Sequence, residues 1–335
     1  MQASKENPAY SVVLTTLTGE QYELTPVLST LELSHQKDQL AVCATLALMN
    51  ISYQGRWLNA MIEARQRVCI YADDGERHLE VFRGFVWSTS YLSATEDREL
   101  TVTCYDNLIF WQESEDTAFF PAGYTTESIL TSLAGAWGIP LTYRYRSITH
   151  GKLALRGTLA DQVTGEVLDP VKKQTGAKYA IVMEGDTALI RTAGDNTDYY
   201  KIVQASNAIH TRSGHTMEGM VTKVQVLGAA KNGQAPVEAT VTGDTAKYGT
   251  LQKLQDRGGD TTLADARAEA QATIDENGSP KWEYELKCSD IPWIRKGDRV
   301  YVSVGGIYQK TLIVWSIDRE ISDEGRIMTL TMEDP

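Results

Sequence analysis

Residues 85–106 read FVWSTSYLSATEDRELTVTCYD, and residues 313–334 read IVWSIDREISDEGRIMTLTMED. Aligned without a gap, these 22-residue stretches share eight identities, including Val-Trp-Ser near the start and Thr-x-Thr near the end. In the first stretch, Leu100, Val102 and Cys104 fall on one face of an alternating strand. Both stretches therefore predict the same β-hairpin, written twice in one chain.

The similarity extends upstream of each hairpin. Residues 63–75 (EARQRVCIYADDG) resemble residues 294–306 (IRKGDRVYVSVGG), since each has a basic turn, Arg-Val, an alternating strand and a turn with glycine. The elements keep their order, with four extra residues in the first copy. We interpret the pattern as a duplication of one β-barrel. Because there are only two copies and they lie far apart, the chain is not a solenoid.

These patterns predict a mainly β fold with an α+β middle domain and two related β-barrels. The first barrel spans residues 1–115, where an Asp-Asp-Gly turn separates two β-rich runs. The middle domain spans 116–204. The second barrel spans 205–335 and carries a helical insertion at about 246–277.

Two helices are expected in the middle domain. Thr125 or Thr126 caps the first, whose apolar residues fall on one face, and Gly138 and Pro140 end it. The second runs from about 160 to 174 with a break near Asp169-Pro170. In the second barrel, an alanine-rich helix is expected to start at Thr261 or Thr262 and to end at Asn277-Gly278.

Composition narrows the function classes. The chain is 42% hydrophobic and 23% charged, as in soluble globular proteins, and no apolar run is long enough to span a bilayer. The start has no signal-peptide pattern. The net charge of −12 argues against direct nucleic-acid binding, which depends on clustered Lys and Arg. We expect the four cysteines (Cys43, Cys69, Cys104, Cys288) to be reduced, and three of them lie in strand-like runs.

No pattern predicts a metal or cofactor site. His210 and His215 lie five residues apart in a polar stretch without a partner motif, and we interpret them as surface histidines. The acidic stretches 71–76 and 194–198 lack the spacing of a calcium loop and are typical of turns.

No pattern predicts a catalytic site either, because no nucleophile elbow, phosphate loop or dinucleotide fingerprint occurs. Trp87 and Trp315 hold matching places in the repeats, which favours shared packing over ligand stacking. We expect Asp106 to end a strand and cap the turn 108–111, whereas Asp334 simply ends the chain. The sequence predicts no catalytic, cofactor-binding or metal-binding residue.

A duplicated barrel has a consequence for assembly. A ring of three such chains presents six nearly equivalent barrels, so a trimer would have pseudo-sixfold symmetry and could join a sixfold partner to a threefold one. The duplication alone does not establish the trimer.

Residues 98–141 (RELTVTCYDNLIFWQESEDTAFFPAGYTTESILTSLAGAWGIPL) resemble the segment that joins the first barrel to the middle domain in baseplate hub proteins of prophage-like contractile tails. The final stretch from Ile291, with its Gly-Asp-x-Val strand and terminal Met-Thr-Leu hairpin, is similar to the end of those proteins. The resemblance covers most of the chain in order.

The resemblance implies a non-enzymatic, homotrimeric hub between the hexameric tail tube and the trimeric central spike of a contractile phage tail, phage-tail-like bacteriocin or injection particle. Implied partners are the tube protein, the spike or tip protein, the baseplate wedge proteins and the tape measure protein, without membrane insertion. The hub would assemble in the bacterial cytoplasm and leave by lysis as part of the particle. Because the chain ends at Pro335, directly after the second barrel, spike and wall-cutting activities are expected in separate proteins.

A second hypothesis stays open. Seven tryptophans and many acidic residues are compatible with a soluble β protein that binds or hydrolyses cell-wall polysaccharide. Such an enzyme needs a pair of carboxylates or an activated nucleophile, and the sequence singles out neither.

Overall fold

The computed structural model of the 335-residue chain describes residues 8–53, 55–93, 98–203, 208–230, 233–258 and 261–335. The chain forms two compact units. The large unit comprises Met1–Arg212 and Tyr284–Pro335, and the small unit comprises Ser213–Glu283.

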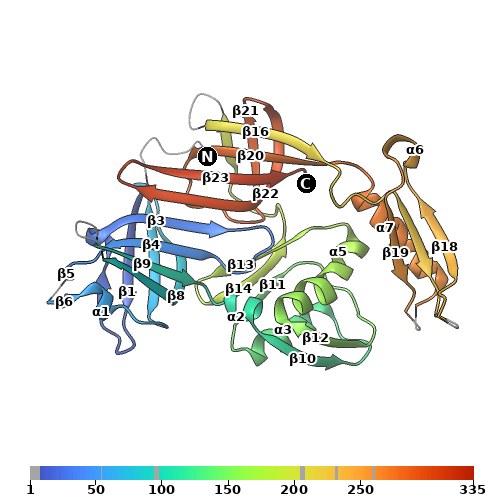
Figure 1. The fold of residues 1–335 in the computed structure, drawn as a ribbon, viewed down its shortest axis with the longest axis horizontal. Helices are drawn as coiled ribbons and strands as arrows, with labels where there is room; N and C mark the ends of the chain where they lie inside the picture. Colours follow the sequence, from blue (N-terminus) through green and yellow to red (C-terminus); the bar gives the residue numbers. More distant parts are fainter. Residues whose placement is uncertain (1–7, 54, 94–97, 204–207, 231–232, 259–260) are drawn as a thin grey trace. The chain divides into compact units, whose positions relative to one another are not determined.

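Thirteen of the described strands form one hydrogen-bonded sheet (Figure 1). Its main path runs β16-β20-β23-β22-β3-β4-β9-β8-β7-β1-β2, and β21, which pairs with β22, adds β15. In chain order these strands are β1 (Ala9–Thr15), β2 (Gln21–Glu23), β3 (Leu28–His35), β4 (Cys43–Met49), β7 (Arg67–Asp73), β8 (His78–Ser93), β9 (Arg98–Tyr105), β15 (Tyr200–Val203), β16 (Ala208–Thr216), β20 (Lys281–Ser289), β21 (Arg299–Val304), β22 (Ile307–Ser322) and β23 (Gly325–Glu333).

The first copy of the repeated hairpin is β8–β9. Phe85 pairs with Tyr105 and Ser88 pairs with Thr103, and the register shifts between these two pairs. Trp87 is therefore the extra residue of a β-bulge, which bends the strand locally. The first half of β8 pairs on its other side with β7.

The second copy, β22–β23, repeats this register at a constant offset of 228 residues. Ile313 pairs with Glu333 and Ser316 pairs with Thr331, and the shift falls again at the tryptophan, Trp315. The first half of β22 pairs with β21, as β8 does with β7. A shared register and a shared bulge are harder to obtain by chance than shared letters, so the two predicted β units are confirmed as related.

The strands that precede the hairpins also correspond. The backbone N–H of Asn50, just after β4, donates to the carbonyl of Arg98 at 2.8 Å. The N–H of Asp290, just after β20, donates to the carbonyl of Arg326 at 3.1 Å. Since Arg98 and Arg326 differ by the same 228 residues, β4 and β20 hold equivalent places beside β9 and β23.

The two repeats are not separate sheets, which the sequence did not predict. The hairpin β3–β4 joins them, because β3 pairs with β22 and β4 pairs with β9. Each repeat still has a core of its own: Leu46 and Val102 lie in the first and Leu286 and Leu330 in the second, all fully or almost fully buried. Burial of alternate side chains fixes the register, since a slip of one residue would expose the apolar set.

The middle of the large unit is α+β, as predicted. It contains α2 (Ile109–Glu113), β10 (Glu115–Phe120), α3 (Thr126–Ala136), β11 (Leu141–Arg144), β12 (Leu153–Thr158), α4 (Leu159–Asp161), α5 (Asp169–Thr175), β13 (Tyr179–Glu184) and β14 (Thr187–Thr192). Strands β10 and β12 form one small sheet, and β11, β14 and β13 another.

The predicted caps and stops hold in this region. The Thr125 side chain accepts a hydrogen bond from the backbone N–H of Ser128 and caps α3. The second helical stretch has the expected irregularity, but as a π-helical segment, Gln162–Leu168, between α4 and α5. Pro170 lies in the first turn of α5, where its missing N–H costs nothing.

The small unit packs one helix against a three-stranded sheet. It contains β17 (Lys223–Leu227), β18 (Val237–Thr242), α6 (Thr245–Tyr248), β19 (Gln252–Asp256) and α7 (Leu263–Asn277). Thr262 caps α7 by accepting from the N–H of Asp265. The predicted insertion at about 246–277 lies inside this unit, and the structure adds β17 and β18 to it, which the sequence analysis assigned to the second barrel.

Four short elements complete the fold: a 3-10 turn (Thr25–Val27), β5 (Ser52–Tyr53), β6 (Arg56–Trp57) and α1 (Leu58–Met61). Within the described ranges, none of the helices combines the length and the apolar character that crossing a membrane requires.

Candidate functional site

The joint between the repeats, where β22 pairs with β3, is the candidate assembly site of this protein. Six residue pairs, from Ile317–His35 to Ser322–Thr30, form an antiparallel ladder. Ile317 and Ile321 point into the core, where they are 2% and 4% exposed. A strand from one repeat thus covers the edge of the other.

The turn after β3 is fixed by one buried lysine of the second repeat. The Lys296 ammonium donates to the backbone carbonyls of Gln36, Lys37 and Gln39 at 2.8, 2.8 and 2.7 Å. Burial lowers the pKa of Lys296 to about 8. The charged ammonium donates to all three carbonyls at once, so it stabilises this turn.

His35, the last residue of β3, is buried in the same joint. Its Nε2 lies 3.1 Å from the carbonyl oxygen of Leu40. Burial, and then the nearby charge of Lys296, lower the pKa of His35 to about 3. The imidazole is therefore neutral at physiological pH, and the joint is sensitive to acid.

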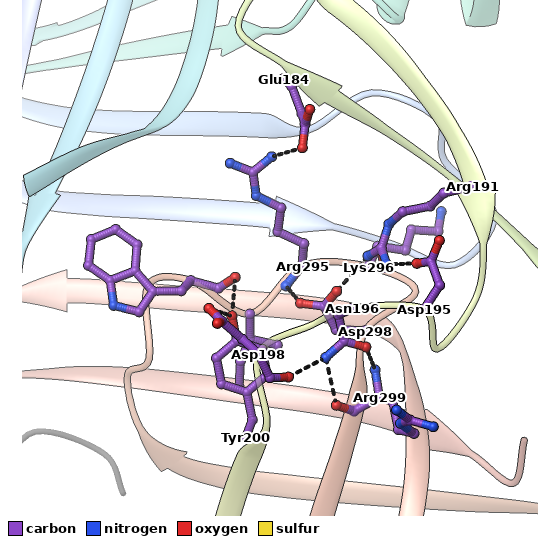
Figure 2. A network of polar contacts seen from close by, with 12 residues as sticks. Glu184, Arg191, Asp195, Asn196, Asp198, Tyr200, Arg295, Lys296, Asp298 and Arg299 are labelled. Atoms are coloured by element: carbon purple, nitrogen blue, oxygen red, sulfur yellow. Dashed lines mark hydrogen bonds and ion pairs between the residues drawn. The ribbon is translucent and has the colours of Figure 1, made fainter. Parts of the chain in front are cut away.

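A second polar network ties the middle domain to the second repeat (Figure 2). Arg191 on β14 donates to Asp195 at 2.6 Å and to Asp298 at 2.5 Å, and Asp298 also accepts from the backbone N–H of Arg295 at 2.8 Å. Burial alone would lower the pKa of Arg191, but the charges of Asp298 and Asp195 and their hydrogen bonds together outweigh it, and the pKa is raised. The pair is charged and nearly enclosed.

Gly297 lies at the same contact and has φ +83°. A Cβ atom at this position would collide with the side chain of Ala180 on β13. Both the left-handed backbone and the close approach require glycine, so the contact tolerates little displacement.

The second repeat contains a buried cluster of charged side chains, where the end of β20 lies near β22. Asp290 accepts from the Tyr10 hydroxyl and from Arg319, whose Nε lies 2.9 Å away. Arg319 also donates to the carbonyl of Ile294 at 2.6 Å. Arg319 on β22 corresponds by register to Tyr91 on β8, which is 41% exposed.

The solvent face of the joint is acidic. Glu32 on β3 lies directly opposite Glu320 on β22, and the next pair in register on this face is Ser34 with Asp318. The Ser34 hydroxyl donates to Asp318 at 2.7 Å. Directly opposed carboxylates repel one another, so this face presents negative charge.

The structure places the sequence candidates apart from one another. The ring centre of His215 lies 4.9 Å from that of Trp282, whereas His210 is an exposed residue of β16. In the parts of the chain that the structure describes, no three His, Cys, Asp or Glu side chains are grouped so as to hold a metal ion. The four cysteines are free thiols, three of them buried.

The acidic stretches form turns. In 71–76, the Asp73 carboxylate accepts from the N–H of Gly75 at 2.8 Å and that of Asp74 from the N–H of Arg77 at 2.7 Å. In 194–198, the Asn196 side chain accepts from the N–H of Arg299 at 2.6 Å. These contacts are backbone capping, as turn chemistry predicts.

The two tryptophans share a backbone position but not an environment. Trp87 is 43% exposed and packs edge-on against Tyr105, with ring centres 5.9 Å apart. Trp315 is partly buried, and its Nε1 has no hydrogen-bond partner among the described residues. The sequence predicted that the two tryptophans hold matching places in the repeats, but it did not predict the β-bulge at each of them.

Asp106 caps the turn as predicted: it accepts from the N–H of Leu108 at 2.9 Å and also from the N–H of Val42 at 3.0 Å. The prediction for Asp334 is wrong. Its carboxylate accepts from Lys310 at 2.9 Å and its carbonyl accepts from Lys178 at 2.8 Å. Asp334 therefore anchors the C-terminal end of the repeat to the middle domain.

Comparison with known proteins identifies the family of this chain. The YQBQ-like family model matches residues 34–333. The chain belongs to the YQBQ-like family. A search of curated proteins found no match.

Among solved structures, this family member is similar to the 43 kDa tail protein of prophage MuSo2 from Shewanella oneidensis, with a TM-score of 0.70 and 16% identity over 98% of this chain and 99% of that one. It is similar to a tail protein from Neisseria meningitidis MC58, with a TM-score of 0.69 and 13% identity over 97% of each chain.

A third similar structure is the E. coli c3393 protein, with a TM-score of 0.56 and 10% identity over 98% of this chain and 77% of that one. That protein is described as a component of the type VI secretion system with structural similarity to the T4 bacteriophage tail proteins gp27 and gp5. The fold is thus that of phage tail proteins, which confirms the resemblance to tail proteins predicted from sequence.

Proposed function

We propose that this YQBQ-like protein is a structural baseplate hub. Three copies form a ring whose six related β units give a pseudo-sixfold face, which joins a hexameric tail tube to a trimeric central spike of a contractile tail-like particle. The duplicated hairpin, with its common register and bulge, carries the proposal, because a duplicated unit is what a threefold ring needs in order to match a sixfold partner. The fold similarity to tail proteins supports it.

The proposal keeps the three-part division made from sequence: β units at 1–115 and 205–335 around the middle domain at 116–204. Its partners are the tube, spike, wedge and tape measure proteins, and its role is non-enzymatic. The protein assembles in the bacterial cytoplasm and then belongs to a particle released by lysis.

Measurement of the oligomer mass tests this proposal. Sedimentation equilibrium of the purified chain, together with native mass spectrometry of the hub taken from particles, should give three times the mass of the chain. A strict monomer in both preparations would overturn the ring.

The acidic face of the joint supplies a second, finer proposal about the ring. We propose that Glu32, Asp318 and Glu320 line its bore, where like charge reduces the sticking of anionic cargo. All three side chains are exposed on the face of the sheet opposite the core, which supports this placement. The potential mapped on the assembled ring should be negative along the bore, and a positive or neutral bore would contradict it.

A further inference from the structure

The second half of β8 is an edge that lacks the cover its counterpart has. Residues Thr89–Ser93 pair with β9, and the structure describes no strand on their other side. The equivalent residues of β22 have β3 on that side. Thr89 and Ser93 are exposed, whereas their counterparts on β22, Ile317 and Ile321, are 2% and 4% exposed.

The strand that would cover this edge can be identified from the repeat. In the first repeat β3 pairs with β4, and β4 corresponds to β20. The neighbour of β20 on the side away from β23 is β16, so β16 holds the place of β3 in the second repeat. β16 ends the described sheet, and its Ile209 is 59% exposed.

The two open edges are not paired with each other in the described sheet, where six strands separate β8 from β16. We infer that the edge of β8, Thr89–Ser93, pairs with β16, Ala208–Arg212, of a second copy of this chain, antiparallel and in the geometry of the internal β22–β3 joint. This inference rests on the proposed ring and names the contact that closes it.

The surroundings of the β8 edge fit such a partner. Met49, Glu99 and Leu92 lie in one row across β4, β9 and β8, and Met49 is 49% exposed. Ile51 and Trp57, which follow β4, are 43% and 47% exposed. An unpaired strand next to exposed apolar side chains is a template for strand addition. Because the two edges differ, the contact is head to tail, and in the proposed trimer its rotation closes a ring of three chains.

Disulfide trapping tests the pairing directly. Ser90→Cys is combined in turn with Ile209→Cys, His210→Cys or Thr211→Cys, three consecutive residues of β16 that sample both faces of the strand, because only a partner on the same face as Ser90 can come within bonding distance across the paired edges. Oxidation should link the chains of one of the three double variants into covalent dimers and trimers.

The matched control is Asp318→Cys with the same three partners. Asp318 corresponds to Ser90, but β3 of its own chain already occupies that edge. These variants should give no linked species above the level of the parent protein. Linked species from the Asp318 set equal to those from the Ser90 set would mean random collision and would overturn the pairing.

An edge charge provides the second test. Leu92→Lys should raise the concentration at which the oligomer half-dissociates by about tenfold or more, because lysine on an edge strand opposes strand addition. Leu17→Lys, at a site that is 66% exposed in the turn after β1, should leave it unchanged.

The outcomes separate this inference from the hub proposal. A wild-type trimer that is neither linked in any Ser90 variant nor weakened by Leu92→Lys overturns the β8–β16 contact and leaves the ring in place. A wild-type chain that remains monomeric at every concentration and in the particle, without linked species, overturns both.

Discussion

The two long strands β8 and β22 have the same length, the same bulge and the same register, but only β22 has its second half covered. In β22, β3 adds a strand and the side chains beneath it are buried. In β8, the equivalent residues are exposed. One chain thus contains both the closed and the open form of one contact. Strand length, bulge and register therefore belong to the repeat itself, whereas burial of the second half of the strand comes from the added strand, β3.

The largest expected difference is at the equivalent positions Arg319 and Tyr91. Arg319→Ala should lower the free energy of unfolding by about 3–5 kcal/mol, because it leaves the buried Asp290 without its ion pair. Tyr91→Ala should cost less than about 1 kcal/mol in the dissociated protomer, since no buried charge depends on it. Urea unfolding at low protein concentration measures both, and equal costs would contradict the assignment of a closed and an open position.

The covering strands offer the next comparison. Leu33→Ala on β3 should cost about 2–4 kcal/mol, because this side chain is 4% exposed and its removal leaves a cavity in the joint. Ile209→Ala on β16 should cost less than about 1 kcal/mol in the dissociated protomer, since Ile209 is 59% exposed. If both substitutions destabilise the dissociated protomer alike, β16 is already covered there and its edge is not open.

Acid should weaken the closed joint through His35. The pKa of His35 is lowered to about 3 in the fold, against an ordinary value of 6.5. The unfolded chain therefore binds a proton below about pH 6.5 that the folded chain does not, and stability is lost as pH falls from there toward 3. Between pH 6.5 and pH 5 the loss should be about 1.5–2 kcal/mol.

Substitution of His35 isolates this contribution. His35→Gln should be less stable than the wild type at pH 7 but should lose about 1.5–2 kcal/mol less between pH 6.5 and pH 5. Urea unfolding at several pH values, with His210→Gln at an exposed site as the control, measures the difference. An unchanged pH slope in the His35 variant would contradict a neutral, buried imidazole.

The smallest effect should come from the carboxylate pair on the solvent face. Glu320→Gln removes the repulsion with Glu32 and should stabilise the protein by about 0.2–1 kcal/mol at low salt. The gain should shrink at high salt because exposed charges are screened. Thermal unfolding at two salt concentrations measures it, and a gain that does not depend on salt would point to a cause other than charge.

The sequence predicted the local elements because local patterns encode them. The Val-Trp-Ser and Thr-x-Thr matches identified the repeated hairpin, and the threonine pairs 125–126 and 261–262 each contained the residue that caps a helix. Pairing between distant strands has no such signal. Nothing in the letters of β3 indicates that its partner is β22, nearly three hundred residues away, because any alternating strand with one apolar face is a plausible neighbour.

The same reason explains the other differences. The residues of β17 and β18 were assigned to the second barrel, because a strand pattern does not show to which sheet the strand belongs. Asp334 ends a strand, and its ion pair with Lys310 depends on how the hairpin folds back. The site residues Lys296 and His35 could not be singled out, because their roles arise from burial that only the packed joint creates.

An electron cryo-microscopy map of the purified oligomer tests the central claim most directly. The account predicts three chains with six equivalent strand joints, three β22–β3 joints within chains and three β8–β16 joints between chains, which superimpose on one another. A map in which the β8 edge faces solvent, or in which the chains meet through other surfaces, would contradict it.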